Sequence, residues 1–160
     1  MEQGRIVAQG TPHEVLGAPM QETVAQLAGF ENIFDATVDS VHEDRGTMTC
    51  RMTSGTQTEN PVLLETPVIR AEVGSHLRVG IRAGDILLAI AKPVGLSARN
   101  VLAGRVVSLE RRDMVISARV DCGVEMEVYL TLAARDDLRL SEGREVWLVI
   151  KTYSCHLLRR

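Results

Sequence analysis

The chain carries an internal duplication, and this feature limits the possible folds more than any other. Residues 32–38 (NIFDATV) are echoed 68 residues later by residues 100–106 (NVLAGRV). The two copies also close alike, because residues 74–82 (GSHLRVGIR) match residues 143–151 (GREVWLVIK) at an offset of 69. A repeat of this kind predicts two similar modules that pack against each other. A chain of 160 residues leaves room for two small cores of roughly 60 to 70 residues each.

Inside each copy, aliphatic side chains recur at every second position. The runs at residues 124–130 and 145–150 show this most clearly. An alternation of period two is typical of strands with one buried face. We therefore expect a mainly β fold of about five short strands per copy, arranged as two small OB-like barrels in tandem. A short helix is expected over residues 132–138, a charged hairpin turn at 111–113 and a surface loop at 55–61.

The first 29 residues follow a different pattern, typical of a short strand-turn and then helices. Thr11, Pro12 and Glu14 fit the first positions of a helix that begins with a capping box. A second helix is expected over residues 21–28, with Gly29 ending it in the left-handed conformation. The sequence thus divides into a short α-helical segment at 1–29, a first module at 30–92 and a second module at 93–160, with a linker at 92–95.

Composition argues against several classes of protein. Aromatic residues are 3% of the chain and the net charge is −3, so binding of nucleic acid by stacking or by a basic surface is not expected. Cys50, Cys122 and Cys155 include no Cys-x-x-Cys pair, which argues against a disulfide framework or a zinc site and favours a reducing compartment. Neither a membrane span nor a signal peptide is predicted, so we expect a cytoplasmic location.

The sequence also gives no sign of catalysis. It has no Gly-x-x-x-x-Gly-Lys-Ser/Thr loop to hold nucleotide phosphates, and no nucleophile stands at a suggestive spacing from a base. The four histidines have no spacing typical of metal ligands. We therefore expect no catalytic residue, no cofactor and no protein-bound metal ion.

The segment Ser97-Ala98-Arg99-Asn100 precedes a predicted strand and occurs in the second copy only. At a strand edge, free backbone amides, a serine hydroxyl and a guanidinium can converge on one small anion. A tetrahedral oxyanion needs several directed donors and partial neutralisation, and arginine offers a forked set of donors that stays protonated. The same tetrapeptide also fits an ordinary solvated surface, so its context decides between the two interpretations.

Several residues around this segment fit one known pattern. They are Ser97-Ala98-Arg99-Asn100 with Gly104, a Thr131 that ends a strand, Leu138-Arg139-Leu140 with Gly143, and Ile150-Lys151. The pattern strongly resembles the Mop domain, the molybdenum-pterin-binding-protein-like module. Residues from about 30 to 158 resemble the tandem pair of such modules in the C-terminal regulatory part of the molybdate ABC transporter ATP-binding subunit. Residues 4–12 and 14–19 resemble the segment that ends ABC ATPase domains, so the chain is expected to be a fragment of a longer subunit.

The resemblance implies OB-like modules that bind molybdate or tungstate at their seams. Carried over residue by residue, the oxyanion ligands are Ser97, Ala98 through its backbone, Arg99, Thr131 and Lys151, with Asn100 as a structural or secondary contact. One departure concerns Ala134, which stands three residues after the threonine, where some relatives supply a serine hydroxyl. A donor is therefore expected to be missing there or replaced by a backbone amide.

The first copy departs further from the pattern. The equivalents of residues 97–100 are Gly29, Phe30, Glu31 and Asn32, and Arg82-Ala83 stands in place of Lys151-Thr152. Glu31 would repel a dianion. The first copy is therefore expected to be mainly a structural partner, with Arg82 lending positive charge at most.

These features predict a regulatory domain of a molybdate or tungstate importer ATPase that senses the intracellular anion at a seam between modules or subunits. We expect a homodimer, attached to an upstream ABC ATPase domain and through it to a membrane permease, peripheral to the inner membrane. The alternative is a passive dimerisation module of an ABC importer ATPase, for this or another substrate, with no functional anion site. The sequence does not separate molybdate from tungstate, because the two dianions have nearly the same size and charge.

Overall fold

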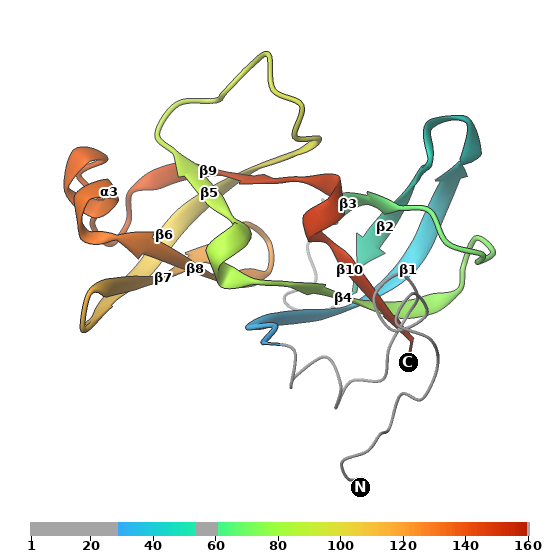
Figure 1. Cartoon of the computed structure of the whole chain (residues 1–160), viewed down its shortest axis with the longest axis horizontal. Helices are drawn as coiled ribbons and strands as arrows, with labels where there is room; N and C mark the ends of the chain where they lie inside the picture. The colour runs from blue at the N-terminus through green and yellow to red at the C-terminus, as the bar shows by residue number, and fades with distance from the viewer. Residues whose placement is uncertain (1–28, 54–60, 160) are drawn as a thin grey trace, which may run out of the picture.

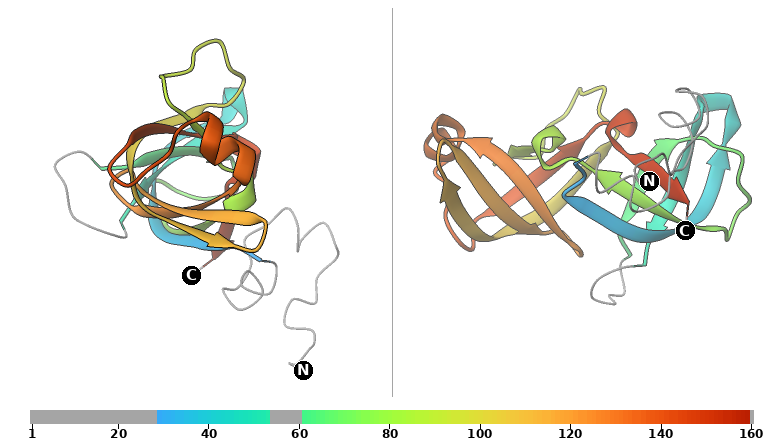
Figure 2. Two further views of the ribbon diagram at one scale, coloured as in Figure 1. Left: turned by 90° about the vertical axis from the view of Figure 1, so that its left-hand side faces the viewer. Right: turned by 60° about the horizontal axis from the view of Figure 1, so that its bottom comes forward.

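The structure is a computed structural model that describes residues 29–53 and 61–159. The strand-turn and helices predicted before residue 29 lie outside the described residues, as does most of the loop predicted at 55–61. In the described part the chain is mainly β, as predicted, with two curled five-stranded sheets. The sheets lie side by side along the long axis of the molecule (Figure 1), and an end-on view shows their strands curling round (Figure 2).

Each sheet is antiparallel throughout. The first has the order β10-β4-β1-β2-β3 and the second the order β5-β9-β6-β7-β8. The strands of the first are β1 (Asn32–His42), β2 (Thr47–Met52), β3 (Leu63–Pro67), β4 (His76–Ile81) and β10 (His156–Arg159). Those of the second are β5 (Leu87–Ala89), β6 (Asn100–Arg112), β7 (Val115–Asp121), β8 (Glu125–Thr131) and β9 (Glu145–Ile150).

Short helical segments and turns connect the strands. They are η1 (Glu43–Arg45), η2 (Ala83–Asp85), α3 (Leu132–Asp137) and η3 (Thr152–Ser154). α3 confirms the helix predicted over residues 132–138. The charged turn predicted at 111–113 is the hairpin between β6 and β7, where Asp113 has a φ of 59°. Gly29 has a φ of 86°, the left-handed conformation predicted for it.

The two sheets exchange one strand each. β5 follows β4 in the sequence but pairs with β9 of the second sheet, through Leu87 opposite Val149. β10 follows β9 but pairs with β4 of the first sheet, through His156 opposite Gly80. Because β5 and β10 begin 69 residues apart, they are equivalent segments of the two copies. Each copy thus completes the sheet of the other, so membership of the sheets crosses the boundary expected between residues 92 and 93.

β1 and β6, the long first strands of the two copies, carry a β-bulge at the same place. The register with the next strand shifts between Val38 and Ser40 in β1, and between Val106 and Ser108 in β6. A bulge bends and twists its strand, which helps a short sheet to curl. The duplicated bulges therefore give both copies the same curl.

The core is aliphatic and continuous across both sheets, since one cluster of buried side chains includes residues of both copies. Bulky members of this cluster, each under 2% exposed, are Met48, Leu64, Ile81, Met126, Leu148 and Ile150. Close packing also explains Gly104, because a Cβ at this position would lie 2.7 Å from Cδ1 of Leu148. The two copies therefore form one packed body. None of the helices in the described part of the chain has the length and apolar character to span a membrane.

Candidate functional site

Two buried asparagines join the sheets to each other. Asn100, at the start of β6, donates through Nδ2 to the carbonyl of Glu65 (3.0 Å), and its Oδ1 accepts from the amide of Glu65 (2.7 Å). Asn32, at the start of β1, makes the same pair of bonds with the backbone of Glu127, at 2.9 and 2.8 Å. Both asparagines are 4% exposed. The bonds satisfy backbone groups on β3 and β8 and fix one sheet against the other.

Each asparagine marks a junction that we call a seam. The register of β1 with β4 pairs Asn32 with Ile81, and that of β6 with β9 pairs Asn100 with Ile150. The residue before each asparagine therefore lies beside the residue after each isoleucine. The first seam consists of Glu31, Asn32, Arg82 and Ala83, with η2 against β8. The second seam consists of Arg99, Asn100, Lys151 and Thr152, with η3 against β3.

The second seam brings together two cations. The guanidinium of Arg99 is 62% exposed, and its Nε lies 3.5 Å from Oε1 of Glu65, which is 19% exposed. Lys151 is also exposed and directly precedes η3. An exposed ion pair of this kind contributes little to stability, because water screens it. The Arg99 guanidinium therefore stays available to a stronger acceptor, with the Lys151 ammonium on the neighbouring strand end.

Thr152 adds a donor that the sequence did not single out as a ligand. Its hydroxyl is buried and has no hydrogen-bond partner within the part of the chain that the structure describes. A buried hydroxyl without a partner costs free energy, so such a group in a seam calls for an explanation. The signal in the sequence was the exchange of alanine for threonine beside the cation, from Arg82-Ala83 to Lys151-Thr152.

The remaining ligands expected from the sequence divide into two groups. Ser97 is exposed and Ala98 half-buried, and both lie in the segment that leads into β6, next to Arg99. Thr131 lies elsewhere in this chain: it pairs with Val115, which pairs with Arg112 at the far end of β6 from Asn100. Figure 1 shows α3, which Thr131 caps, at one end of the molecule.

The Thr131 hydroxyl acts as a hydrogen-bond acceptor within the described chain. Its Oγ1 accepts from the backbone amide of Ala134 at 3.0 Å, which leaves its own proton to donate. The Ala134 amide is therefore bonded to Thr131 and not directed at a ligand. The single chain assembles Ser97, Ala98, Arg99, Asn100 and Lys151 at one seam, and holds Thr131 apart from them.

A buried thiol lies behind the second seam. Asn100 Nδ2 lies 3.8 Å from Sγ of Cys155, which directly follows η3. Burial raises the pKa of the Cys155 thiol from 9.0 to about 12, and the nearby Cys50 adds to the rise. At neutral pH this thiol is protonated, so it is neither a nucleophile nor a thiolate ligand.

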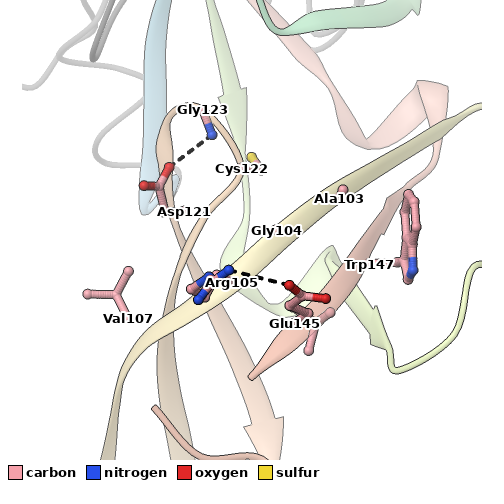
Figure 3. A pocket seen from close by; sticks show the side chains of 10 residues that line it. Ala103, Gly104, Arg105, Val107, Asp121, Cys122, Gly123, Glu145 and Trp147 are labelled. Carbon is pink, nitrogen blue, oxygen red and sulfur yellow. Dashed lines mark hydrogen bonds and ion pairs between the residues drawn. The ribbon is translucent and has the colours of Figure 1, made fainter. Parts of the chain in front are cut away.

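A separate hollow of about 640 Å³ lies on the second sheet (Figure 3). Arg105 and Glu145 bridge it with a 3.3 Å ion pair, so their charges largely cancel. Asp121 is bonded to the amide of Gly123, and burial raises the pKa of the Cys122 thiol. None of the predicted ligands lines this hollow. Its charged lining residues are Arg105, Asp121 and Glu145, a net charge of −1 that does not favour an anion, and the lining offers no activated nucleophile.

The chain is similar to several known proteins. Residues 96–157 match the TOBE domain family. The chain is 35% identical over 154 residues to the molybdenum import ATP-binding protein ModC of Rhizobium meliloti (strain 1021), a match that covers 95% of this chain and 41% of that protein. It is 30% identical over 154 residues to the molybdate/tungstate import ATP-binding protein WtpC of Pyrococcus abyssi (strain GE5 / Orsay), covering 95% and 39%.

A solved structure is also similar in fold. The cytoplasmic molybdate-binding protein ModG, in a form with molybdate bound, superposes with a TM-score of 0.68 at 22% identity, covering 82% of this chain and 97% of that one. The chain spans about two fifths of the length of its import-protein relatives. It therefore contains a TOBE domain at residues 96–157 and is homologous, over nearly its whole length, to the C-terminal region of molybdenum import ATP-binding proteins.

Proposed function

We propose that this chain binds molybdate or tungstate at its second seam, as the regulatory C-terminal part of an import ATPase. The observation that carries the proposal is the second seam itself. There Arg99 and Lys151 directly flank the paired strand ends Asn100 and Ile150, and Thr152, whose buried hydroxyl has no partner among the described residues, follows Lys151. The similarity to a molybdenum import protein, a molybdate/tungstate import protein and a molybdate-binding protein supports the choice of anion.

The donors at this seam suit a tetrahedral dianion. Arg99 and Lys151 supply two positive charges against the single carboxylate of Glu65. Ser97 and Thr152 add neutral hydroxyl donors. Charge-assisted hydrogen bonds are roughly twice as strong as neutral ones, so the two cations set the affinity and the hydroxyls set the orientation.

A second copy of the chain completes the site in this proposal. Thr131 is too far from Arg99 to share an anion within one chain, whereas its free hydroxyl proton at the end of β8 is open to a partner. Exposed apolar side chains next to the second seam support a protein contact there: Leu87 is 65% exposed, Val94 85% and Tyr153 80%. A twofold dimer would place each copy's Thr131 at the other copy's second seam.

Such a site gives feedback on transport. An anion held between two copies binds only the associated arrangement and shifts the population toward it. If the chain is attached to an ATPase domain, as in the longer relatives, that arrangement would hold the ATPase domains apart when intracellular molybdate is plentiful. The regulatory role thus follows from linkage between anion binding and subunit arrangement.

The alternative is a passive dimerisation module, and one contact favours it. The Arg99–Glu65 ion pair already gives the guanidinium an acceptor inside the chain. In that case the apolar surface around Tyr153 would still join two copies, but no anion would be needed. Titration calorimetry with molybdate, tungstate, sulfate and phosphate separates the two functions.

Substitutions at the second seam test the ligand set. We expect Arg99→Ala and Lys151→Ala each to weaken molybdate binding by about tenfold or more, and Ser97→Ala by less, because charged donors contribute more than neutral ones. Thr152→Val should weaken binding about threefold to tenfold without lowering stability, since its hydroxyl has no partner among the described residues. Arg45→Ala, an exposed arginine of η1, is the control for loss of one positive charge.

Unchanged affinity in both Arg99→Ala and Lys151→Ala, in proteins that fold and dimerise normally, would leave the passive module as the better conclusion. Sedimentation with and without molybdate tests the dimer separately. A species of 17.6 kDa at high micromolar concentration under both conditions would contradict the shared site.

A further inference from the structure

We propose that Glu31 closes the first seam to anions by placing its own carboxylate on the backbone amide that an anion would need. The inference rests on the proposed function, because it explains why a chain with two similar seams would bind its oxyanion at one of them. Glu31 then acts as a resident substitute for the anion, and its removal exposes a second binding site.

A direct contact carries the proposal. Oε1 of Glu31 accepts from the backbone amide of Ala83 at 2.8 Å. Ala83 is fully buried, and a buried N–H group needs an acceptor. A carboxylate on a backbone amide is a charge-assisted bond, of the kind that an oxyanion would make at the same place.

The second seam has an equivalent backbone, but the side chain in the position of Glu31 carries the opposite charge. Thr152 stands 69 residues after Ala83, and both follow a cation at the end of equivalent strands. Arg99 occupies the position of Glu31, and a guanidinium has donors only, so it cannot accept from the Thr152 amide. The buried Thr152 hydroxyl also has no hydrogen-bond partner in the described chain. This is an independent sign that donors in the second seam, unlike the Ala83 amide in the first, lack an acceptor.

Several charged groups lie around the first seam. Arg82 lies over the ring of Phe30, with its guanidinium carbon 4.8 Å from the ring centroid. Asp85 lies in η2, two residues after Ala83. Glu127 on β8 lies 3.9 Å from Arg112, which is paired with Glu110 at 3.1 Å. Loss of the Glu31 carboxylate removes one negative charge together with the acceptor on the Ala83 amide, and both changes favour an incoming anion.

Two substitutions distinguish a Glu31 oxygen that occupies the Ala83 amide from a Glu31 charge that merely repels anions. Glu31→Ala removes both the charge and the acceptor. Glu31→Gln removes the charge but keeps an amide oxygen that can accept from Ala83. Because Glu31 is exposed, neither change disturbs the core. Glu43→Ala, an exposed glutamate of η1 in the same sheet, is the control for the change in net charge.

The experiment follows the backbone amides of Ala83 and Thr152 by NMR while sodium molybdate is added to the ¹⁵N-labelled chain, with calorimetry for stoichiometry. In the wild type and in Glu43→Ala, we expect Thr152 to shift and Ala83 to stay. In Glu31→Ala both amides should shift, and the stoichiometry should rise from one to two anions per chain. Glu31→Gln should behave as the wild type.

Three results bear on the proposal in different ways. An Ala83 amide that stays unmoved at saturating molybdate in Glu31→Ala overturns it. Equal opening by Glu31→Gln also overturns it, because repulsion alone would then explain the closed seam. A response of Ala83 in Glu31→Ala, combined with no response of Thr152 in any variant, supports the role of Glu31 and refutes the proposed function of the second seam.

Discussion

The two seams share a backbone and differ in the side chains that line it. Both are held by a buried asparagine that bonds the backbone of a glutamate on the opposite sheet. The first seam satisfies its own amide with Glu31, whereas the second has Arg99, Lys151 and a Thr152 hydroxyl without a partner among the described residues. The two copies thus share the residues that hold the seams together and differ in the side chains beside them.

The seams also differ in how bulk is distributed. Phe30 packs on Gly80 in the first seam, where a Cβ on the glycine would lie 3.1 Å from the ring. The equivalent pair in the second seam is Ala98 and Val149. The first seam thus pairs a large ring with a glycine, whereas the second pairs a small side chain with a valine. The Phe30 ring covers Gly80 in the first seam, whereas Ala98 of the second seam is small and half-buried.

The largest expected effect tests this exchange of bulk. Phe30 is 7% exposed and contacts Leu158, Gly80 and the ring of His156. Phe30→Ala should lower the free energy of unfolding by about 3 to 5 kcal/mol, because it leaves a cavity at the first seam. The equivalent Ala98→Gly should cost about 1 kcal/mol or less. Urea denaturation of both variants measures the two losses in free energy of unfolding. Equal losses would contradict a larger packing role for Phe30 than for Ala98.

The next effect concerns the asparagines. Asn32→Ala and Asn100→Ala should each cost about 1 to 3 kcal/mol, because each leaves a buried amide and carbonyl of a glutamate unpaired. The two losses should be similar in denaturation experiments. Only Asn100→Ala should also weaken molybdate binding in calorimetry, since it positions Arg99. An equal loss of binding in Asn32→Ala would break the distinction between the seams.

The smallest effect uses pH. Cys155 is buried at the second seam, where the first has Ile86. Burial raises the pKa of its thiol from 9.0 to about 12, so above pH 9 the unfolded chain loses this proton while the folded chain keeps it. The free energy of unfolding should therefore fall as pH rises above 9, by about 1 kcal/mol between pH 9 and pH 10 for this group. Cys155→Val should remove that part of the slope in denaturation series at pH 8 to 10.5; an unchanged slope would show that the Cys155 thiol does not titrate as its burial requires.

Much of the fold followed from local patterns. The repeat and the alternation of residues 124–130 and 145–150 predicted two small β modules, and the structure confirms them. The exchange of β5 and β10 was not predicted. Both segments contain a Leu-Leu pair and follow equivalent strands, so either sheet could accept either segment by pattern alone. Which sheet each joins depends on contacts between copies, which periodicity does not encode.

The ligand roles given to Arg99, Lys151 and Thr131 stay a prediction, and the structure gives only the positions of these residues. Arg99 and Lys151 directly flank the paired ends of β6 and β9, a pairing that the sequence did not predict. The separation of Thr131 from them did not follow, because it depends on the length and path of β6 and β7. The role of Asn100 as a bond between sheets also needed the fold, since its partner, Glu65, stands 35 residues earlier in the other sheet.

By itself the sequence determined the class of fold, the presence of two copies and the difference in charge between them. The period of the apolar side chains and the residue types are local properties, and they do not depend on the tertiary arrangement. Only the tertiary structure decided that Glu31 bonds the Ala83 amide, that the Thr152 hydroxyl is buried without a partner in the described chain, and that each copy completes the sheet of the other. These features depend on which groups meet after the two sheets have packed together, and burial then makes every unpaired donor or acceptor costly.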